Sequence, residues 1–248
     1  MPSNILSSEF LRYLVTFSNE ETENESRLPP LSTLSEEIGL SVSSLREQLE
    51  VAKAMGLVEV RPRTGIRRLP YTFLPAVRQS LSYAIASDWR FFLKFADLRN
   101  HIEAAYWGEA VRNLQPEDHL KLKILMEQAW TKLRDQPVQI PHREHRLLHT
   151  CLYHRLDNPF VEGLLEAYWE AYEGVGLNLY TDLEYLKLVW NYHQEMVDTI
   201  FEGNFDAGFK ALVSHKDLLF HRNLTEIVAT SASDADCNVN LFNYEPTE

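Results

Sequence analysis

The chain has 248 residues, of which 45% are hydrophobic, and its formal net charge is −12. This length and composition are typical of a folded protein with one large or two modest domains, and they exclude a largely disordered chain. The acidic balance also excludes a protein that binds nucleic acid over its whole surface, because phosphate contacts need Lys and Arg.

The first part of the chain predicts three helices followed by a hairpin. Apolar residues at helical spacing indicate helices in residues 5–17, 32–40 and 43–55, with Gly56 ending the third. Residues 57–62 and 66–71 alternate like strands around a short turn. This order is typical of a winged helix-turn-helix, which we place at residues 1–74 as a DNA-binding domain. The alternative is a small α/β cap with no nucleic-acid role.

Positive charge is concentrated in this predicted domain. Residues 41–68 hold six Lys or Arg against three Glu. In a helix-turn-helix, the start of the second helix reaches base edges and phosphates, so we expect DNA contacts from Ser41, Ser43, Ser44 and Arg46. The alternative for the serines is that they only cap the helix.

The predicted hairpin is rich in arginine, with Arg68 at its end. Packing in a hydrophobic core does not account for a tight hairpin rich in arginine. We therefore favour contact of the hairpin with DNA phosphates or the minor groove over a merely solvated face. The candidate DNA-binding residues of this wing are Arg61, Arg63, Gly65 and Arg67.

From about Pro75 the pattern is uniformly helical. Apolar stripes separated by short breaks predict helices in residues 76–94, 97–112, 117–134, 139–155, 159–175, 182–202 and 205–228. The expected fold class is therefore mainly α: the winged helix-turn-helix joined to a bundle of six or seven antiparallel helices. We place this second domain at residues 75–230 and a polar C-terminal tail at residues 231–248.

Four histidines of the helical domain form a candidate metal site. His145 and His149 are four residues apart and project from one helical face, while His193 and His215 are 22 apart, across two helices joined at Gly203-Asn204. A shell of nitrogen ligands favours Zn, Ni or Cu. The alternative is that these histidines are ordinary core residues. We assign no functional role to the remaining histidines: His101, His119, His142, His154 and His221. Of these, His142 is a reserve candidate for a metal ligand, because it lies on the same helical face as His145 and His149.

Other classes of protein find no support in the sequence. No apolar run approaches the length that spans a bilayer, and residues 1–20 do not resemble a signal peptide, so we expect a cytoplasmic protein with no membrane partner. Cys151 and Cys237 lack CxxC spacing, which argues against a disulfide framework or a thiolate zinc site.

Residues 28–68 resemble the DNA-binding domain of the GntR family of bacterial transcription regulators. The matching stretch begins LPPLSTLSEEIGLSVSSLREQLEVAKAMGLVEVRPRTGI. It follows the family pattern of a Leu-Pro start, a helix ending in Leu-Gly, a serine turn, Arg-Glu followed by Leu, and a Gly-tipped wing. The family usually has Glu-Arg after the Leu-Pro-Ser start, and that arginine contacts DNA. Here Leu31 and Ser32 stand instead, so the family's operator sequence does not carry over.

The helical half resembles the FCD sensor domain of the FadR subfamily. Arg99 and Glu103 in DLRNHIEAAYWGEA match an Arg-x-x-x-Glu helix of that domain. Residues 144–169 are similar to its segment with a metal-ligand helix and an Asn-Pro turn, and residues 193–215 to its closing helix pair. With the winged helix, the resemblance covers most of residues 28–220.

The resemblance implies a dimeric regulator that binds operator DNA and responds to a small organic acid. We therefore place Arg99 in an effector pocket, as the partner of a carboxylate; the alternative is an intrahelical pair with Glu103. The family has Asp at the position of His145, so this chain departs toward four histidines, for which we expect Zn or Ni. If His145 turns away, three histidines leave open positions.

We therefore expect a metal-dependent, ligand-responsive, homodimeric transcription regulator and not an enzyme. Two alternatives stay open. One is a metal-dependent hydrolase in which the histidines activate water and Glu144 or Glu195 acts as base, although HExxH is absent. The other is a regulator whose metal is purely structural.

Overall fold

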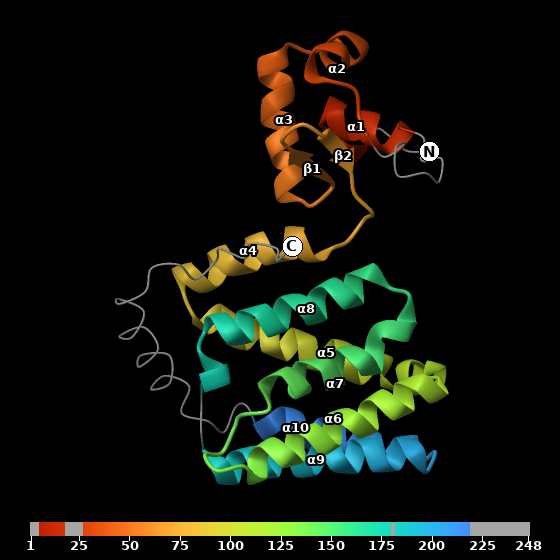
Figure 1. Cartoon of the computed structure of the whole chain (residues 1–248), viewed down its shortest axis with the longest axis vertical. Coiled ribbons are helices and arrows are strands. Elements are labelled where there is room, and N and C mark those ends of the chain that lie inside the picture. Colours follow the sequence, from red (N-terminus) through yellow and green to blue (C-terminus); the bar gives the residue numbers. More distant parts are fainter. Residues whose placement is uncertain (1–4, 18–26, 180–181, 219–248) are drawn as a thin grey trace. The chain divides into compact units, whose positions relative to one another are not determined.

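The computed structural model describes residues 5–17, 27–179 and 182–218 (Figure 1). The predicted C-terminal tail lies outside this range. Packing divides the chain into two compact units, residues 1–80 and 81–248, whose boundary falls inside helix α4 (Leu74–Ser87). The boundary expected from sequence, between residues 74 and 75, lies at the first turn of that helix, and the division into functional domains stays a prediction.

The first unit is a winged helix-turn-helix. It comprises α1 (Glu9–Thr16), α2 (Leu31–Ile38), α3 (Val42–Ala54), β1 (Val58–Arg61) and β2 (Gly65–Arg68). Gly39 ends α2 at φ 76°, a left-handed conformation that glycine adopts without strain, so α3 begins three residues later, at Val42. One apolar side of each element meets in a common core: Phe10, Leu14, Leu28, Leu34, Leu45, Leu49, Ala52, Val58 and Ile66.

The wing is an antiparallel hairpin in which Val58 pairs with Arg68 and Arg61 with Gly65. Its tip uses positive φ at Arg63 (69°) and Gly65 (81°). The chain before α2 extends this small sheet, since Leu28 N–H donates to the Ile66 carbonyl at 2.9 Å. The predicted order of three helices and a hairpin is therefore the observed one.

The second unit is a helical bundle. After α4 come α5 (Arg90–Asn113), α6 (Pro116–Arg134), α7 (His142–Tyr153), α8 (Pro159–Gly174), α9 (Leu183–Phe201) and α10 (Phe205–Asp217), with short 3-10 turns η2 (His154–Leu156) and η3 (Leu177–Leu179). In this part α9 packs on α6 and α10, and α5 packs on α7, α8 and α10. The predicted mainly α fold is confirmed.

Polar caps set the starts of these helices. Asn158 accepts from the backbone N–H groups of Phe160 and Val161, ahead of Pro159 at the first position of α8. Asp182 caps α9 and Asn204 caps α10 in the same way. These three helices therefore begin at positions that the local sequence fixes.

One predicted helix boundary is wrong. The sequence analysis separated two helices near residues 95–96, whereas α4 ends at Ser87 and α5 begins at Arg90. The cause is Asp88, whose carboxylate accepts from the Arg90 backbone N–H at 3.0 Å and from its side chain at 2.9 Å. Predicted residues 219–228 of the last helix lie outside the described residues.

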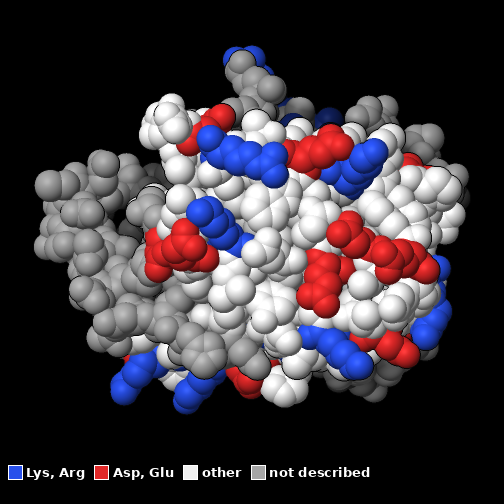
Figure 2. Space-filling model, turned by 90° about the horizontal axis from the view of Figure 1, so that it is seen from below, with Lys and Arg blue, Asp and Glu red and all other residues white. Residues whose placement is uncertain are grey.

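The surface of the bundle is mixed in charge. On the face seen in Figure 2, which includes α9, Lys and Arg side chains are interspersed with Asp and Glu among uncharged residues. A single-sign basic field, which nucleic acid requires, does not appear on this face. No helix in the described ranges is both long and apolar enough to cross a membrane.

Candidate metal centre and nucleic-acid interface

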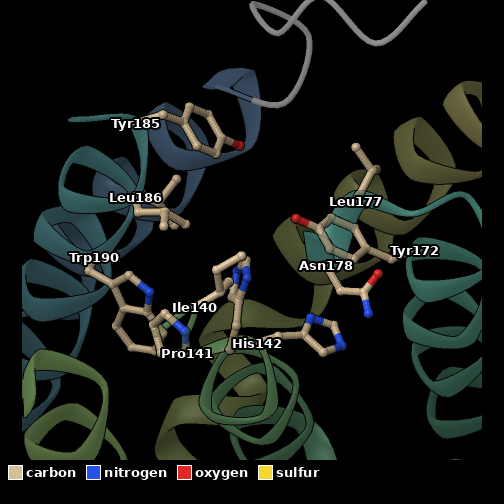
Figure 3. A pocket seen from close by; sticks show the side chains of 11 residues that line it. Ile140, Pro141, His142, Tyr172, Leu177, Asn178, Tyr185, Leu186 and Trp190 are labelled. Atoms are coloured by element: carbon tan, nitrogen blue, oxygen red, sulfur yellow. The ribbon is translucent and has the colours of Figure 1, made fainter. Parts of the chain in front are cut away.

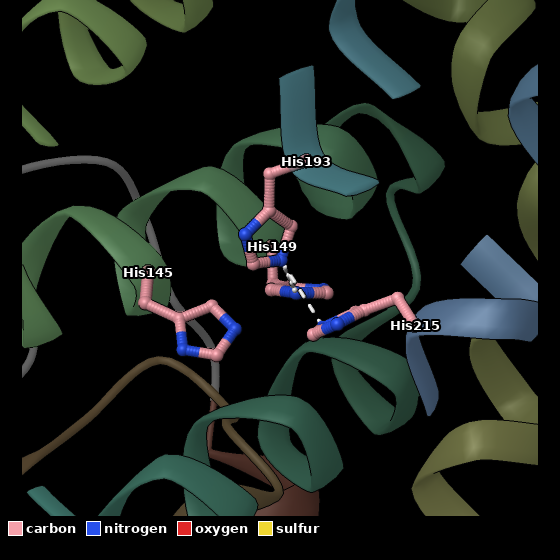
Figure 4. A group of neighbouring side chains, drawn as sticks. All are labelled: His145, His149, His193 and His215. Carbon is pink, nitrogen blue, oxygen red and sulfur yellow. Dashed lines mark hydrogen bonds between the residues drawn. The ribbon is translucent and has the colours of Figure 1, made fainter. Parts of the chain in front are cut away.

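Three helices bring the four histidines together (Figure 4). His145 and His149 lie one turn apart on α7, His193 lies in the middle of α9 and His215 in the last turn of α10. The pair α9 and α10 packs closely because Gly208 has no side chain: a Cβ there would lie 2.7 Å from Thr199 Oγ1. The hairpin that the 22-residue spacing implies therefore places both rings at one depth of the bundle.

The rings converge on a common point. The Nε2 atom of His193 lies 3.1 Å from Nε2 of His149 and 3.1 Å from Nε2 of His215. The His145 ring centroid is 4.6 Å from that of His193, and one nitrogen of each ring lies within 4.8 Å of the others. Nitrogens bound at 2.0–2.1 Å to one tetrahedral ion stand about 3.3 Å apart. We call these four residues the four-histidine cage.

A buried ion pair between Arg99 and Glu103 contacts the cage at His149. Glu103 Oε1 lies 2.8 Å from an Arg99 guanidinium nitrogen and 3.0 Å from His149 Nδ1. The same guanidinium nitrogen lies 2.8 Å from Nδ1, which cannot accept from Arg99 while donating to Glu103. We assign Nδ1–H as the donor to Glu103, since this tautomer leaves Nε2 free to face the other rings.

Burial keeps the imidazoles neutral. It is the main cause that holds the pKa values of His145, His193 and His215 well below their usual range, with neighbouring positive charge adding to it. Burial also lowers the pKa of His149, although Glu103 opposes this. A metal binds the neutral ring, so all four are in the state that coordination requires.

The donor set fits a transition metal. His145 Nε2, His193 Nδ1 and His215 Nδ1 are buried and have no hydrogen-bond partner among the described residues. The atoms that converge are the Nε2 atoms of His149, His193 and His215, and with Nδ1–H on His149 they cannot all be satisfied by hydrogen bonds to one another, which indicates a site made for something other than protein. Nitrogen donors alone favour Zn, Ni or Cu over Mg or Mn.

A second group of potential ligands has a structural explanation. Asp118, Cys151 and His154 also lie close enough to share an ion. However, the Asp118 carboxylate accepts from the Gln115 backbone in a capping box and from Arg155 Nε at 2.8 Å. Burial raises the pKa of the Cys151 thiol, so it is protonated. This group stabilises the start of α6 and does not make a convincing metal site.

A narrow pocket leads to the cage (Figure 3). It has a cavity volume of about 20 Å³, the space of little more than one water molecule. The start of α7, the end of α8, η3 and α9 line it, and His145 belongs both to its wall and to the cage. His145 is the half-buried member of the cage, while the other three are buried.

Arg99 does not line this pocket. It is 4% exposed, pairs with Glu103 and stacks over the Tyr168 ring at 4.6 Å. The intrahelical pair that the sequence left as the alternative is therefore present. The two charged residues continue the apolar stripe of α5 formed by Phe92, Ala96 and Trp107, and a charged pair in such a stripe is the signal that could have identified Glu103 as a buried residue, although not His149 as its partner.

The other alternative, a hydrolase, lacks its base. Glu144 is buried, but both of its oxygens accept from Lys132 at 2.8–2.9 Å. Glu195 is exposed, whereas its neighbour His193 is fully buried in the cage. Neither carboxylate suggested by the sequence therefore faces the histidines.

The predicted DNA-binding residues lie at the start of α3 and on the wing. Ser41 accepts from the Ser44 backbone N–H, so it does cap the helix. Ser43 and Arg46 are exposed on the first turns. On the wing, Arg61 pairs with Glu59 at 3.0 Å, and Arg63 and Gly65 form the tip. The backbone of Arg67 pairs with that of Glu59 across the hairpin and, in an isolated β-bridge, with that of Arg27.

Arg27 was missed by the sequence analysis. It lies outside the segment that matched strand periodicity, yet it is exposed beside the wing, with its guanidinium next to Gly65. A single residue before α2 gives no periodic signal, so only the fold places its charge on this surface.

A winged helix-turn-helix joined to a helical bundle is a layout found in transcription regulators. A sequence model of the FCD domain matches residues 94–229. The chain belongs to the FCD-domain family, within the GntR-type regulators, as the resemblance implied.

Individual relatives agree with this assignment. An uncharacterized HTH-type transcriptional regulator, YieP, of Escherichia coli K12 is 25% identical over 203 residues, covering 77% of this chain and 83% of its own. A putative L-lactate dehydrogenase operon regulatory protein of the same strain is 23% identical, covering 76% and 74%. The structure titled Streptococcus agalactiae GntR aligns with a TM-score of 0.58 at 18% identity, over 78% of this chain and 88% of that one. These relatives are transcription regulators and not enzymes.

Proposed function

We propose that the helical unit of this transcription regulator is a metal-dependent sensor, in which the four-histidine cage binds one divalent transition metal. The observation that carries the proposal is the convergence of four neutral imidazoles, one nitrogen of each within 4.8 Å of the rest, inside the bundle. The Glu103 carboxylate, which accepts from His149 Nδ1–H, supports metal binding, since metal-bound histidines usually donate their other N–H to such a group.

We propose a small carboxylate as the effector, bound to the metal. With a divalent ion, the buried cage, Arg99 and Glu103 together carry a net positive charge, which favours an anionic ligand. In this arrangement Arg99 acts through Glu103 and His149 and does not touch the effector. The name of the lactate-operon relative makes L-lactate a reasonable first acid to test.

A second candidate is a purely structural metal. Four nitrogens complete the tetrahedral shell that Zn²⁺ adopts in structural sites, leaving no position for an effector. Octahedral Ni²⁺ would keep two positions open, and withdrawal of the half-buried His145 would open one position on a tetrahedral ion. The response to acids therefore distinguishes a sensor from a structural site.

For the winged unit, we propose that it binds operator DNA as part of a homodimer, with α3 in the major groove and the wing on the backbone. The exposed Arg46 and the arginines of the hairpin support this orientation. Operators read by such domains are two-fold symmetric, which is the reason to expect two copies.

One experiment tests these proposals together. An operator sequence is first selected from random duplex DNA, and its affinity is then measured by fluorescence anisotropy with chelated protein, Ni²⁺-loaded protein and loaded protein plus acids. The sensor predicts that an acid changes the affinity only when metal is present. An equal response in chelated protein would contradict it, whereas bound metal without any acid response would favour the structural candidate.

A further inference from the structure

The pocket of Figure 3 is lined by groups that can bind a cation. Its volume of about 20 Å³ is large enough for a single ion or water molecule. Within its wall, the Asn178 amide oxygen is buried without a partner among the described residues. Such an oxygen can serve as a ligand for a cation.

The mouth of this pocket is acidic. His142, which lines it, has its Nε2 2.7 Å from a Glu173 carboxylate oxygen, and their side chains are 18% and 39% exposed. Arg146 lies beside them, paired with Glu166 and Glu173. Burial lowers the pKa of Arg146, but Glu166, Glu173 and Glu170 outweigh it and raise that pKa. Three carboxylates therefore outnumber the one guanidinium in this group, which adjoins the pocket at His142.

The inner end of the pocket is His145. His149 and His193 are fully buried and His215 is 6% exposed, so His145 is the cage member that solvent approaches most closely. His142 lies three residues before His145 on the same helix, and its ring stacks on Tyr172 at 5.6 Å. The pocket therefore offers potential metal ligands along its length. These are His142 and Glu173 on the solvent side, the Asn178 amide oxygen in the wall and His145 at the inner end.

We infer that this pocket is the route by which the divalent metal reaches the four-histidine cage, and that His142 with Glu173 is an outer site that captures the ion first. The inference rests on the proposed metal binding. Because His142 and Glu173 are outside the cage, they change the rates of uptake and release together and leave the equilibrium affinity unchanged. A group that holds the ion only during its passage lowers the barrier in both directions, so it speeds uptake and release alike.

The test uses Ni²⁺ and the full-length protein. Trp169 and Trp190 lie with ring centroids 4.7 and 6.0 Å from that of His145, so their fluorescence should report arrival of the ion in the cage. Stopped-flow mixing gives the uptake rate, mixing of loaded protein with excess EDTA gives the release rate, and competition titration gives the affinity. The variants are His142→Gln, Glu173→Gln and Asn178→Leu.

The controls match these changes away from the pocket. His101→Gln alters an exposed histidine that is ion-paired with Asp97, and Glu162→Gln alters an exposed carboxylate at the other end of α8. His193→Ala identifies the cage as the site that the fluorescence reports. Circular dichroism checks that each variant is folded.

We expect uptake and release each to slow by about tenfold in the pocket variants, with an affinity within about twofold of the unchanged protein and normal rates in the controls. Unchanged rates, with binding that His193→Ala abolishes, would overturn the access route but not the proposed function. Faster release with weaker affinity would also overturn it, because His142 would then be a permanent ligand. Absence of any Ni²⁺ binding would overturn both.

Discussion

His149 Nδ1 lies 3.0 Å from the Glu103 carboxylate, and both side chains are fully buried. Burial raises the pKa of Glu103, but the charge of Arg99 and the hydrogen bond from His149 outweigh it, so the pKa lies below its ordinary value and the group is an anion. This anion fixes the tautomer that turns Nε2 of His149 toward the other three rings.

Replacement of this anion should therefore weaken metal binding. We expect Glu103→Gln to reduce metal affinity about 10- to 100-fold, as for other outer partners of ligand histidines. The variant also leaves the buried Arg99 without its ion pair, which costs about 3–5 kcal/mol of stability. Competition titration and urea unfolding measure the two effects. The exposed Glu109 of α5 offers the matched control Glu109→Gln, and equal affinities of the two variants would contradict the role of Glu103.

Without metal, the cage should make the protein sensitive to acid. The pKa values of the four cage histidines are lower in the folded chain than in the unfolded chain, so the unfolded state binds more protons below about pH 6.5. Stability is therefore fully present above that pH and falls as the pH drops. For three or four such groups the loss between pH 6.5 and 5.5 is about 3–4 kcal/mol.

Urea unfolding of chelator-treated protein at pH 7.5, 6.5 and 5.5 measures this loss. The depressed pKa values of Glu103 and Asp118 act at lower pH and do not confuse the result. Stability that stays constant from pH 7.5 to 5.5 would show that the buried imidazoles accept protons as freely as in the unfolded chain.

The close packing of α9 on α10 gives a prediction about stability. A methyl group at Gly208 would lie 2.7 Å from both Thr199 Oγ1 and a Trp107 ring atom, so Gly208→Ala must push α10 away from its neighbours. We expect a loss of about 1–3 kcal/mol and weaker metal binding, because His215 moves with the helix. Thermal unfolding of apo protein and metal titration measure these effects.

Gly174→Ala is the matched control. Gly174 is also helical, but a methyl group there has no atom within 4 Å, so the substitution should be neutral or stabilise by up to about 1 kcal/mol. If the two variants unfold alike, the contact at Gly208 is not the determinant of how α9 and α10 pack.

Arg46 should contribute directly to the affinity for operator DNA. It is exposed on the second turn of α3, and a single arginine contact to a base or phosphate contributes about 1–3 kcal/mol. Arg46→Ala should weaken operator binding by that amount without changing the unfolding temperature. Lys187→Ala removes an equal charge from the helical unit and should bind normally. Full operator affinity in Arg46→Ala would remove α3 from the interface.

The cage was accessible from the sequence because its spacings are short-range. A separation of four places His145 and His149 on one face, and the Gly203-Asn204 break turns His193 and His215 into one hairpin. The family resemblance added their order along the chain. These local rules predict two pairs, whereas the meeting of the two pairs, with 44 residues between His149 and His193, was implied only by the resemblance.

Contacts between helices that are distant in the sequence could not be predicted from short-range spacing. Nothing in the spacing of α5 and α7 reveals that Glu103 meets His149, because 46 residues separate them. The end of α4 was missed since Asp88 stops it without Gly or Pro. The pocket beside His145 combines residues from four elements and exists only after they pack.

The most direct test of the central claim is the metal content of the purified protein, measured by elemental analysis beside the double variant His149→Ala/His193→Ala. The four-histidine cage predicts near-stoichiometric Zn or Ni in the unchanged chain and none in the variant, provided that circular dichroism shows the variant to be folded. Absence of metal from the unchanged chain after incubation with either ion, or equal occupancy in the folded variant, would contradict the claim that these histidines form a metal centre.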